Sequence, residues 1–137
     1  LPSNLKFDKL LSDLKKLEAG KIVKTKNFPK RKGDKPKPIT LHPRKHILVE
    51  GFMLFKNKKV RDFLDVKIYL DLPEKMIVER RKIRFGQDHL NEYDTKVAIP
   101  EFLKYGITQK KYANYVVDAN RPQKKVIKEV ENIIIKV

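Results

Sequence analysis

The sequence predicts an α/β fold with a mostly parallel sheet, because apolar runs of strand length alternate with amphipathic helical patterns. Three short apolar runs are candidates for buried strands: residues 46–51, 66–70 and 115–117. Two longer patterns have helical spacing of their apolar residues, 7–17 and 126–137, and a start signal at 71–74 predicts a further helix that continues through Arg84. With 137 residues and 40% hydrophobic content, the chain is expected to form a single domain, 1–137.

Local signals place the ends of these elements. Gly20 is expected to stop the first helix. The segment 71–74, Asp-Leu-Pro-Glu, resembles a helix start with Asp71 as the N-cap, an early proline and a glutamate at the third helical position. Pro100 begins another helical pattern that Gly106 is expected to interrupt, and Pro122 is expected to start the last helix.

Residues 21–45 combine four prolines with many lysines, which disfavours both a helix and a central strand. We expect an extended basic loop or hairpin. Its lysines could neutralise the phosphates of a nucleic acid. However, Phe28 is the one aromatic side chain available there for base stacking, so a solvated loop near an anionic substrate is an equally good interpretation.

The overall charge of the chain indicates which kind of molecule it can bind. The chain has 33 Lys and Arg against 17 Asp and Glu, a formal net charge of +16, so its surface should attract anions such as nucleotides, metabolite phosphates or nucleic acid. The lack of cysteine excludes disulfides and thiolate metal sites and fits a cytoplasmic protein. No apolar run is long enough to span a bilayer, so no membrane partner is expected.

Two groups of charged residues could carry chemistry. Glu50 and the small Gly51 follow the first predicted strand, where a carboxylate can bind Mg²⁺ directly or through water. Arg80, Arg81 and Arg84 share one predicted helix, and their spacing could form a cationic patch that stabilises phosphoryl oxygens. Glu50 could instead cap a turn or pair with a lysine, and the arginines could form a solvated helix face.

Five segments are informative because of their order along the chain: Pro2–Leu17, Val49–Phe55, Val60–Ile68, Arg80–Arg84 and Pro100–Asn114. The second contains Val-Glu-Gly-x-x-x-Phe, the fourth Arg-Arg-x-x-Arg, and the last Pro-x-Phe followed by Lys-Lys-Tyr-Ala-Asn. Together they resemble the uridine kinase family, within the phosphoribulokinase and uridine kinase group of P-loop kinases. The resemblance covers nearly the whole chain.

This resemblance implies a three-layer P-loop kinase-like fold and ATP-dependent phosphorylation of a hydroxyl on a nucleoside or similar metabolite. ATP and Mg²⁺ would be the cofactors. By the resemblance, the expected roles are metal binding by Glu50, catalysis by Arg81 and Arg84, substrate binding by Phe28 and Arg80, and nucleotide binding by Asn120 and Arg121. A homo-oligomer is compatible with the family.

The sequence departs from the family pattern at two places, and these departures change the function that we expect. No Gly-x-x-x-x-Gly-Lys-Ser/Thr motif occurs, and the lid region at residues 85–99 is shortened. Since the chain opens on Leu1-Pro2, we expect it to be incomplete at the N-terminus and to lack the first β-P-loop-α unit of the family. The chain alone is then expected to be inactive and to need a P-loop segment in cis or in trans. The alternative is a degenerate, inactive kinase-like basic module that binds nucleotide or RNA.

Overall fold

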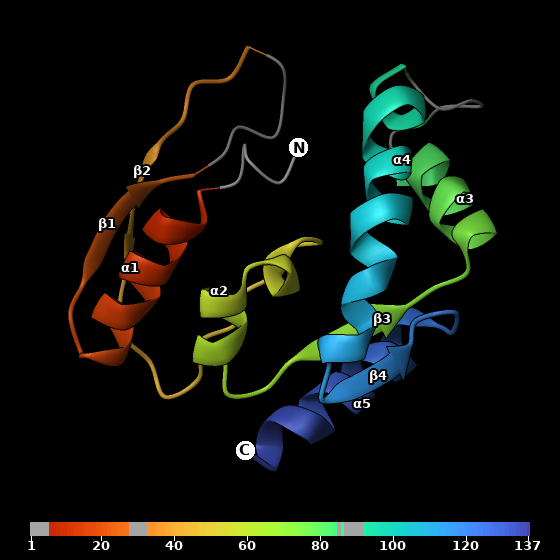
Figure 1. Cartoon of the computed structure of the whole chain (residues 1–137). Helices are drawn as coiled ribbons and strands as arrows, with labels where there is room; N and C mark the ends of the chain where they lie inside the picture. Colours follow the sequence, from red (N-terminus) through yellow and green to blue (C-terminus); the bar gives the residue numbers. More distant parts are fainter. Residues whose placement is uncertain (1–5, 28–32, 85, 87–91) are drawn as a thin grey trace. The chain divides into compact units, whose positions relative to one another are not determined.

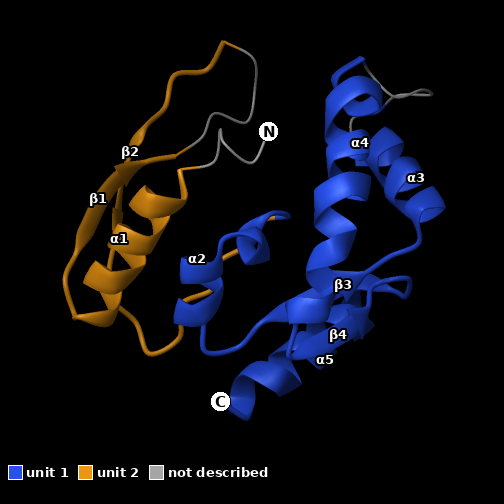
Figure 2. Ribbon diagram, in the orientation of Figure 1, with its two compact units in different colours: residues 1–2, 52–137 blue, residues 3–51 orange. Residues whose placement is uncertain are grey.

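The computed structural model describes residues 6–27, 33–84, 86 and 92–137. The chain divides into two compact units (Figure 2). The N-terminal unit contains residues 3–51, and the C-terminal unit contains residues 52–137 together with the first two residues of the chain.

The N-terminal unit is a helix followed by a two-stranded hairpin. Helix α1 (Phe7–Glu18) buries Leu14 and Leu17, and Gly20 ends it with a positive φ of 79°, a conformation that glycine adopts without strain. Strands β1 (Val23–Lys26) and β2 (Pro38–Leu41) then pair in antiparallel fashion alongside α1 (Figure 1). The predicted first helix and its glycine stop are therefore confirmed.

Residues 46–51 do not form the predicted buried strand. This segment has no regular secondary structure, and Leu48 is 74% exposed. Neither sheet of the structure takes the segment as a partner. Since a short apolar run forms a buried strand only when neighbouring strands pair with it, the run here remains irregular, and Glu50 is exposed.

The C-terminal unit alternates helical segments with two strands. Its elements are η2 (Leu54–Lys56), α2 (Lys58–Phe63), β3 (Ile68–Asp71), α3 (Glu74–Arg84), η3 (Asp94–Ala98), α4 (Ile99–Glu101), η4 (Phe102–Gly106), η5 (Ile107–Tyr112), β4 (Tyr115–Asp118) and α5 (Gln123–Ile135). Strands β3 and β4 pair in parallel, and the helical segments between them supply the long crossover that a parallel pair needs. The α/β composition, both of these strands and the helices α3 and α5 are confirmed.

The described strands nevertheless form two separate two-stranded sheets, and only the β3–β4 sheet is parallel. Asp71 is also not the predicted helix N-cap. It is the last residue of β3, and its carboxylate accepts a hydrogen bond from Lys110 Nζ at 2.7 Å. The helix begins after Pro73, whose carbonyl accepts the first bonds of the helix from the N–H groups of Met76 and Ile77.

A single run of helical residues extends from Glu92 to Tyr112, so the start predicted at Pro100 and the interruption predicted at Gly106 are both wrong. Gly106 is buried and has ordinary helical angles. A Cβ at this position would lie 2.4 Å from Phe102 Cδ2, so the missing side chain makes room for the phenyl ring. Of the predicted lid region, residues 85 and 87–91 lie outside the described residues. No described helix combines the length and the apolar character needed to cross a bilayer.

Candidate functional site

The carboxyl ends of β3 and β4 bring two aspartates together. Asp71 and Asp118 end the two strands and face each other in the parallel register. The chain then continues past the edge, where the Ala119 N–H donates to the Asp71 carbonyl at 2.8 Å. In open α/β sheets, ligands bind outside this edge because the loops that follow the strands converge there.

The loop after β4 holds the two residues expected to bind nucleotide. The backbone N–H of Asn120 donates to Asp118 Oδ1 at 2.8 Å, and Arg121 Nε donates to the Asp118 carbonyl at 2.8 Å. Arg121 also forms an ion pair with Glu129 of α5. These contacts tie the loop both to its own strand and to the following helix.

Arg80 reaches the same loop from helix α3. Its Nη2 donates to the carbonyl of Ala119 at 2.8 Å, so the structure brings one predicted substrate-binding residue together with the predicted nucleotide loop. We name the group formed by Asp71, Arg80, Lys110, Asp118, Asn120 and Arg121 the β3–β4 edge site.

Two ionisable side chains at this site, those of Lys110 and Tyr69, stay protonated at neutral pH. The hydrogen bond from Lys110 to Asp71 raises the pKa of the lysine above its ordinary value. Burial, with the Asp71 charge as a second cause, raises the pKa of Tyr69. At neutral pH the site therefore presents cationic Lys110 and a neutral Tyr69 phenol beside two arginines.

Arg81 is directed to a different partner from Arg80. Its Nε donates to Asp94 Oδ1 at 2.8 Å, and its Nη2 forms an ion pair with the same oxygen. Asp94, on η3, is only 1% exposed. Arg84, the last residue of α3, is exposed. The helix thus uses Arg80 at the β3–β4 edge site and Arg81 to hold η3.

The remaining predicted site residues lie elsewhere in the chain. Glu50 belongs to the N-terminal unit and Phe28 lies outside the described residues. The described part of the chain holds no cluster of three or more His, Cys, Asp or Glu side chains that could bind a metal alone. Glu50 still fits a nucleotide-bound Mg²⁺, because that ion takes most of its ligands from phosphates and water.

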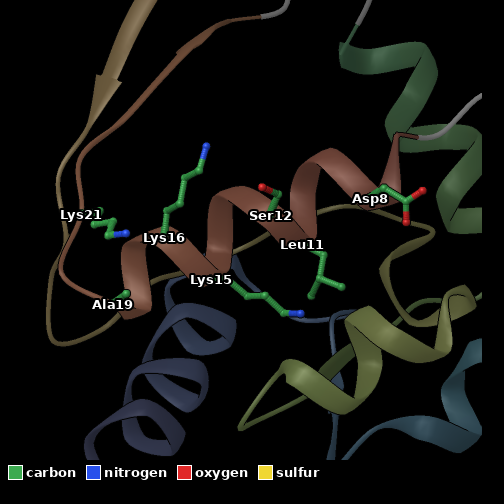
Figure 3. A pocket seen from close by; sticks show the side chains of 7 residues that line it. All are labelled: Asp8, Leu11, Ser12, Lys15, Lys16, Ala19 and Lys21. Atoms are coloured by element: carbon green, nitrogen blue, oxygen red, sulfur yellow. The ribbon is translucent and has the colours of Figure 1, made fainter.

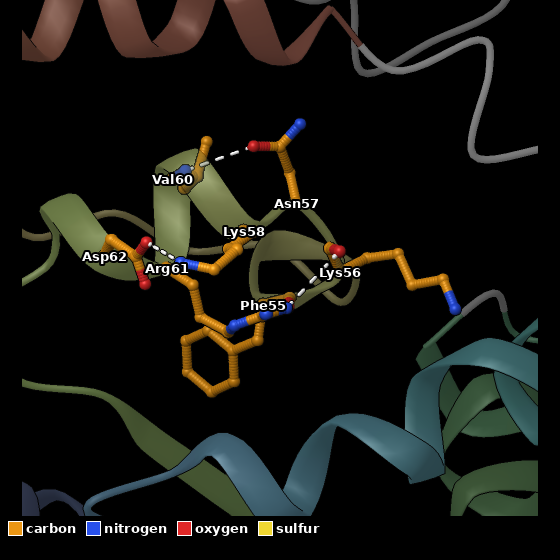
Figure 4. A network of polar contacts seen from close by, with 7 residues as sticks. All are labelled: Phe55, Lys56, Asn57, Lys58, Val60, Arg61 and Asp62. Atoms are coloured by element: carbon orange, nitrogen blue, oxygen red, sulfur yellow. Dashed lines mark hydrogen bonds and ion pairs between the residues drawn. The ribbon is translucent and has the colours of Figure 1, made fainter.

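Two well-connected residues were not singled out in the sequence. Gln109 is 2% exposed, and its amide nitrogen donates to the carbonyls of Phe52 at 2.8 Å and Tyr105 at 3.1 Å. Arg61 donates to the Phe55 carbonyl at 2.7 Å, and Figure 4 shows its side chain beside this turn. It also stacks on the Tyr112 ring, with 3.8 Å from Cζ to the ring centroid. Both hold the turn that follows Glu50-Gly51. In the sequence, one signal could have pointed to Gln109 as an important residue: it lies next to the Lys-Lys-Tyr-Ala-Asn segment.

The N-terminal unit has a shallow depression of about 470 Å³ on helix α1. Lys15, Lys16 and Lys21 line it together with Ser12 (Figure 3). None of the predicted site residues takes part.

A family model and individual known proteins agree on the family that this chain resembles. The model of the phosphoribulokinase/uridine kinase family matches residues 1–128. A uridine kinase of Chlamydia pneumoniae is 31% identical over 130 residues, which cover 89% of this chain and 59% of that protein. A uridine kinase of Aeromonas hydrophila is 28% identical, covering 85% of this chain and 58% of that protein. A uridine kinase-like protein 3 of Arabidopsis thaliana is 28% identical over 85% of this chain and 27% of its own length. The chain thus spans less than two thirds of these relatives.

Proposed function

Because the chain belongs to the phosphoribulokinase/uridine kinase family, we propose that it takes part in ATP-dependent transfer of a phosphoryl group to a hydroxyl of a nucleoside or similar small metabolite. The observation that supports this most directly is the family match over residues 1–128. The β3–β4 edge site adds support, since it joins Arg80 to the loop of Asn120 and Arg121 at the edge where α/β sheets bind ligands.

In this proposal the β3–β4 edge site receives the nucleotide. Hydrogen bonds from Arg80 and Arg121 to backbone carbonyls fix the loop before a ligand arrives, so little loop ordering has to accompany binding. The exposed Asn120 side chain offers both a donor and an acceptor, which suits the edge of a base.

The proposed catalytic cations are Arg81 and Arg84. Charge that develops on a transferring phosphoryl group is stabilised mainly by positioned cations. Arg81 is held by Asp94, so its guanidinium has a defined orientation, which a cation that stabilises a phosphoryl group requires. Phe28 and Arg80 complete the proposal as substrate-binding residues.

The chemistry also needs a phosphate-binding loop. The 137 residues contain no Gly-x-x-x-x-Gly-Lys-Ser/Thr motif, whose backbone amides and lysine hold the phosphates in P-loop kinases. The proposal therefore includes a P-loop segment supplied in cis or in trans, which would complete a three-layer fold with this chain. When bound with the nucleotide, Mg²⁺ would neutralise phosphate charge, with Glu50 as the carboxylate that this chain contributes.

A reconstitution assay tests the proposal. Transfer from γ-labelled ATP to a panel of nucleosides, with Mg²⁺, is measured for the chain alone and for the chain fused to a segment carrying the P-loop motif. We expect transfer only from the fusion, and loss of transfer when the motif lysine is replaced by alanine. Turnover by the chain alone would overturn the need for an added P-loop. Absence of transfer from every fusion that binds ATP would overturn the phosphotransferase itself.

A further inference from the structure

The hairpin of the N-terminal unit carries a disproportionate share of the chain's charge. Residues 21–45 contain ten Lys or Arg and one acidic residue, Asp34, so they hold nine of the sixteen net positive charges. None of these ten basic residues belongs to the β3–β4 edge site or to the other residues of the proposed function, so their concentration needs its own explanation.

The two faces of the hairpin differ in chemistry. Val23 is 3% exposed and Thr25 Oγ1 accepts a hydrogen bond from Lys9 of α1 at 3.1 Å, so this face turns toward the helix. Lys24 and Lys26 alternate with these residues and point to the opposite side. Opposite them in the register are Thr40 and Pro38, and all four residues are exposed. We call Lys24, Lys26, Pro38 and Thr40 the outer face of the hairpin.

The hairpin lysines keep their charge available to an external partner. In the described ranges 21–27 and 33–45, no Lys or Arg side chain forms an ion pair, whereas Lys9, Lys58 and Lys110 elsewhere each hold an aspartate. The basic residues concerned are Lys21, Lys24, Lys26, Lys35, Lys37, Arg44 and Lys45. An anion that binds here consequently displaces no internal ion pair.

We propose that this outer face binds the phosphate backbone of a nucleic acid without reading its sequence. Side chains two positions apart on a strand are spaced about 7 Å along it, so Lys24 and Lys26 form a row of point charges that one extended polyanion can neutralise together, with release of counterions. The outer face contains no aromatic side chain, so it offers no stacking surface that would add base preference.

The same face is poorly suited to a membrane. Basic segments that bind bilayers stably combine their lysines with large apolar side chains that insert among the lipids. The apolar residues of β2, Ile39 and Leu41, are 36% and 39% exposed, but they are paired with Thr25 and Val23 and therefore lie on the opposite face from Lys24 and Lys26. Because the outer face has positive charge but no apolar anchor, a nucleic acid suits it better than a membrane. This inference does not depend on the proposed kinase function.

The test is a salt titration of the 137-residue chain with a labelled 30-nucleotide single-stranded RNA of mixed sequence. The double variant Lys24→Gln/Lys26→Gln is compared with Lys15→Gln/Lys16→Gln, a matched pair that removes the same charge from exposed positions on α1. For two lost phosphate contacts, the slope of log affinity against log salt should decrease by about 1.4 in magnitude. The control pair should change it by less than half of that, and circular dichroism verifies that both variants fold.

Several results would overturn the proposal. Equal changes in the two double variants would mean that only net charge matters. A change confined to the α1 pair would move the binding to the lysine-lined depression. Tighter binding to phosphatidylserine vesicles or to polyglutamate than to the RNA, at the same salt concentration, would assign the outer face to a lipid surface or an acidic protein.

Discussion

The side chain of Gln109 accepts the backbone N–H of Phe55 at 2.8 Å, although the two residues are 54 positions apart in the sequence. With its donor bonds to Phe52 and Tyr105, this buried amide satisfies three backbone groups at once. The turn that follows Glu50-Gly51 therefore depends on a polar side chain of η5.

Replacement of Gln109 by alanine should destabilise the chain by about 2–4 kcal/mol, because buried backbone groups lose their partners and a cavity remains. Urea denaturation measures the change. Gln109→Glu should also destabilise, since a carboxylate can accept from Phe55 but cannot donate to Phe52. The neighbouring Thr108→Ala is the control: it removes one exposed hydrogen bond, from the hydroxyl to the Tyr105 carbonyl, and should cost no more than about 1 kcal/mol. An equal effect at both positions would contradict the role given to the amide.

Gly106→Ala should reverse the usual sign of a glycine-to-alanine change in a helix. Alanine is favoured by about 1 kcal/mol at an open helical site, but here its Cβ would lie 2.4 Å from the Phe102 ring. We expect a net loss of about 1–3 kcal/mol from overpacking. The double variant with Phe102→Leu should recover part of the loss, as measured by thermal unfolding. If the single variant were more stable than the parent chain, the close contact would not be limiting.

Arg81→Gln should lower stability as well as any phosphotransferase activity. The substitution leaves the Asp94 carboxylate, which is 1% exposed, without its guanidinium. Loss of one partner from a buried pair costs about 3–5 kcal/mol, and the partial exposure of Arg81 reduces this to about 2 kcal/mol.

Arg84→Gln, at an exposed position of the same helix, should lower stability less than Arg81→Gln, because exposed interactions of an arginine contribute little. Comparison of kcat and denaturation midpoint in the two variants, made in the reconstituted enzyme, separates the structural role of Arg81 from a catalytic one. A stable Arg81→Gln chain would contradict the supporting role of the pair.

Stability should fall at alkaline pH. The folded-state pKa values of Tyr69 and Lys110 are both raised, so their contributions are fully present below the unfolded values of about 10 and lost as pH rises through the folded values. Unfolding midpoints between about pH 9 and 11.5 measure this loss. Lys110→Met should flatten the profile, whereas Lys111→Met should not. An unchanged profile in Lys110→Met would contradict the contribution of its bond to Asp71.

Arg80→Gln should weaken ATP binding several-fold, because the loop of Asn120 and Arg121 loses its support from α3. Equilibrium dialysis with labelled ATP on the fusion that carries a P-loop measures the effect. Lys75→Gln removes an equal charge from an exposed position of the same helix and should leave affinity unchanged. Similar losses of ATP affinity in both variants would show that the positive charge of the helix is what counts, and not the bond from Arg80 to the loop.

Local patterns in the sequence were sufficient for the elements that need few distant contacts. The leucines at helical spacing before Gly20 predicted α1, and the apolar runs before Asp71 and Asn120 predicted β3 and β4. Proximity of the arginine helix to the last loop was not predictable from spacing, because Arg80 and Ala119 are 39 positions apart. The sequence likewise grouped Arg80 with Arg81, but the structure gives them different partners.

By itself, then, the sequence determined where the backbone can be helical or extended, how charge is distributed and which family the motifs resemble. Tertiary structure decided that residues 46–51 stay unpaired, that Gly106 continues a helix, and that Asp71 bonds to Lys110 instead of capping α3. The physical reason is that these conformations depend on side-chain packing and pairing, which local periodicity does not reveal: a pairing strand for 46–51, the Phe102 ring one turn before Gly106, and the Lys110 ammonium 39 positions from Asp71.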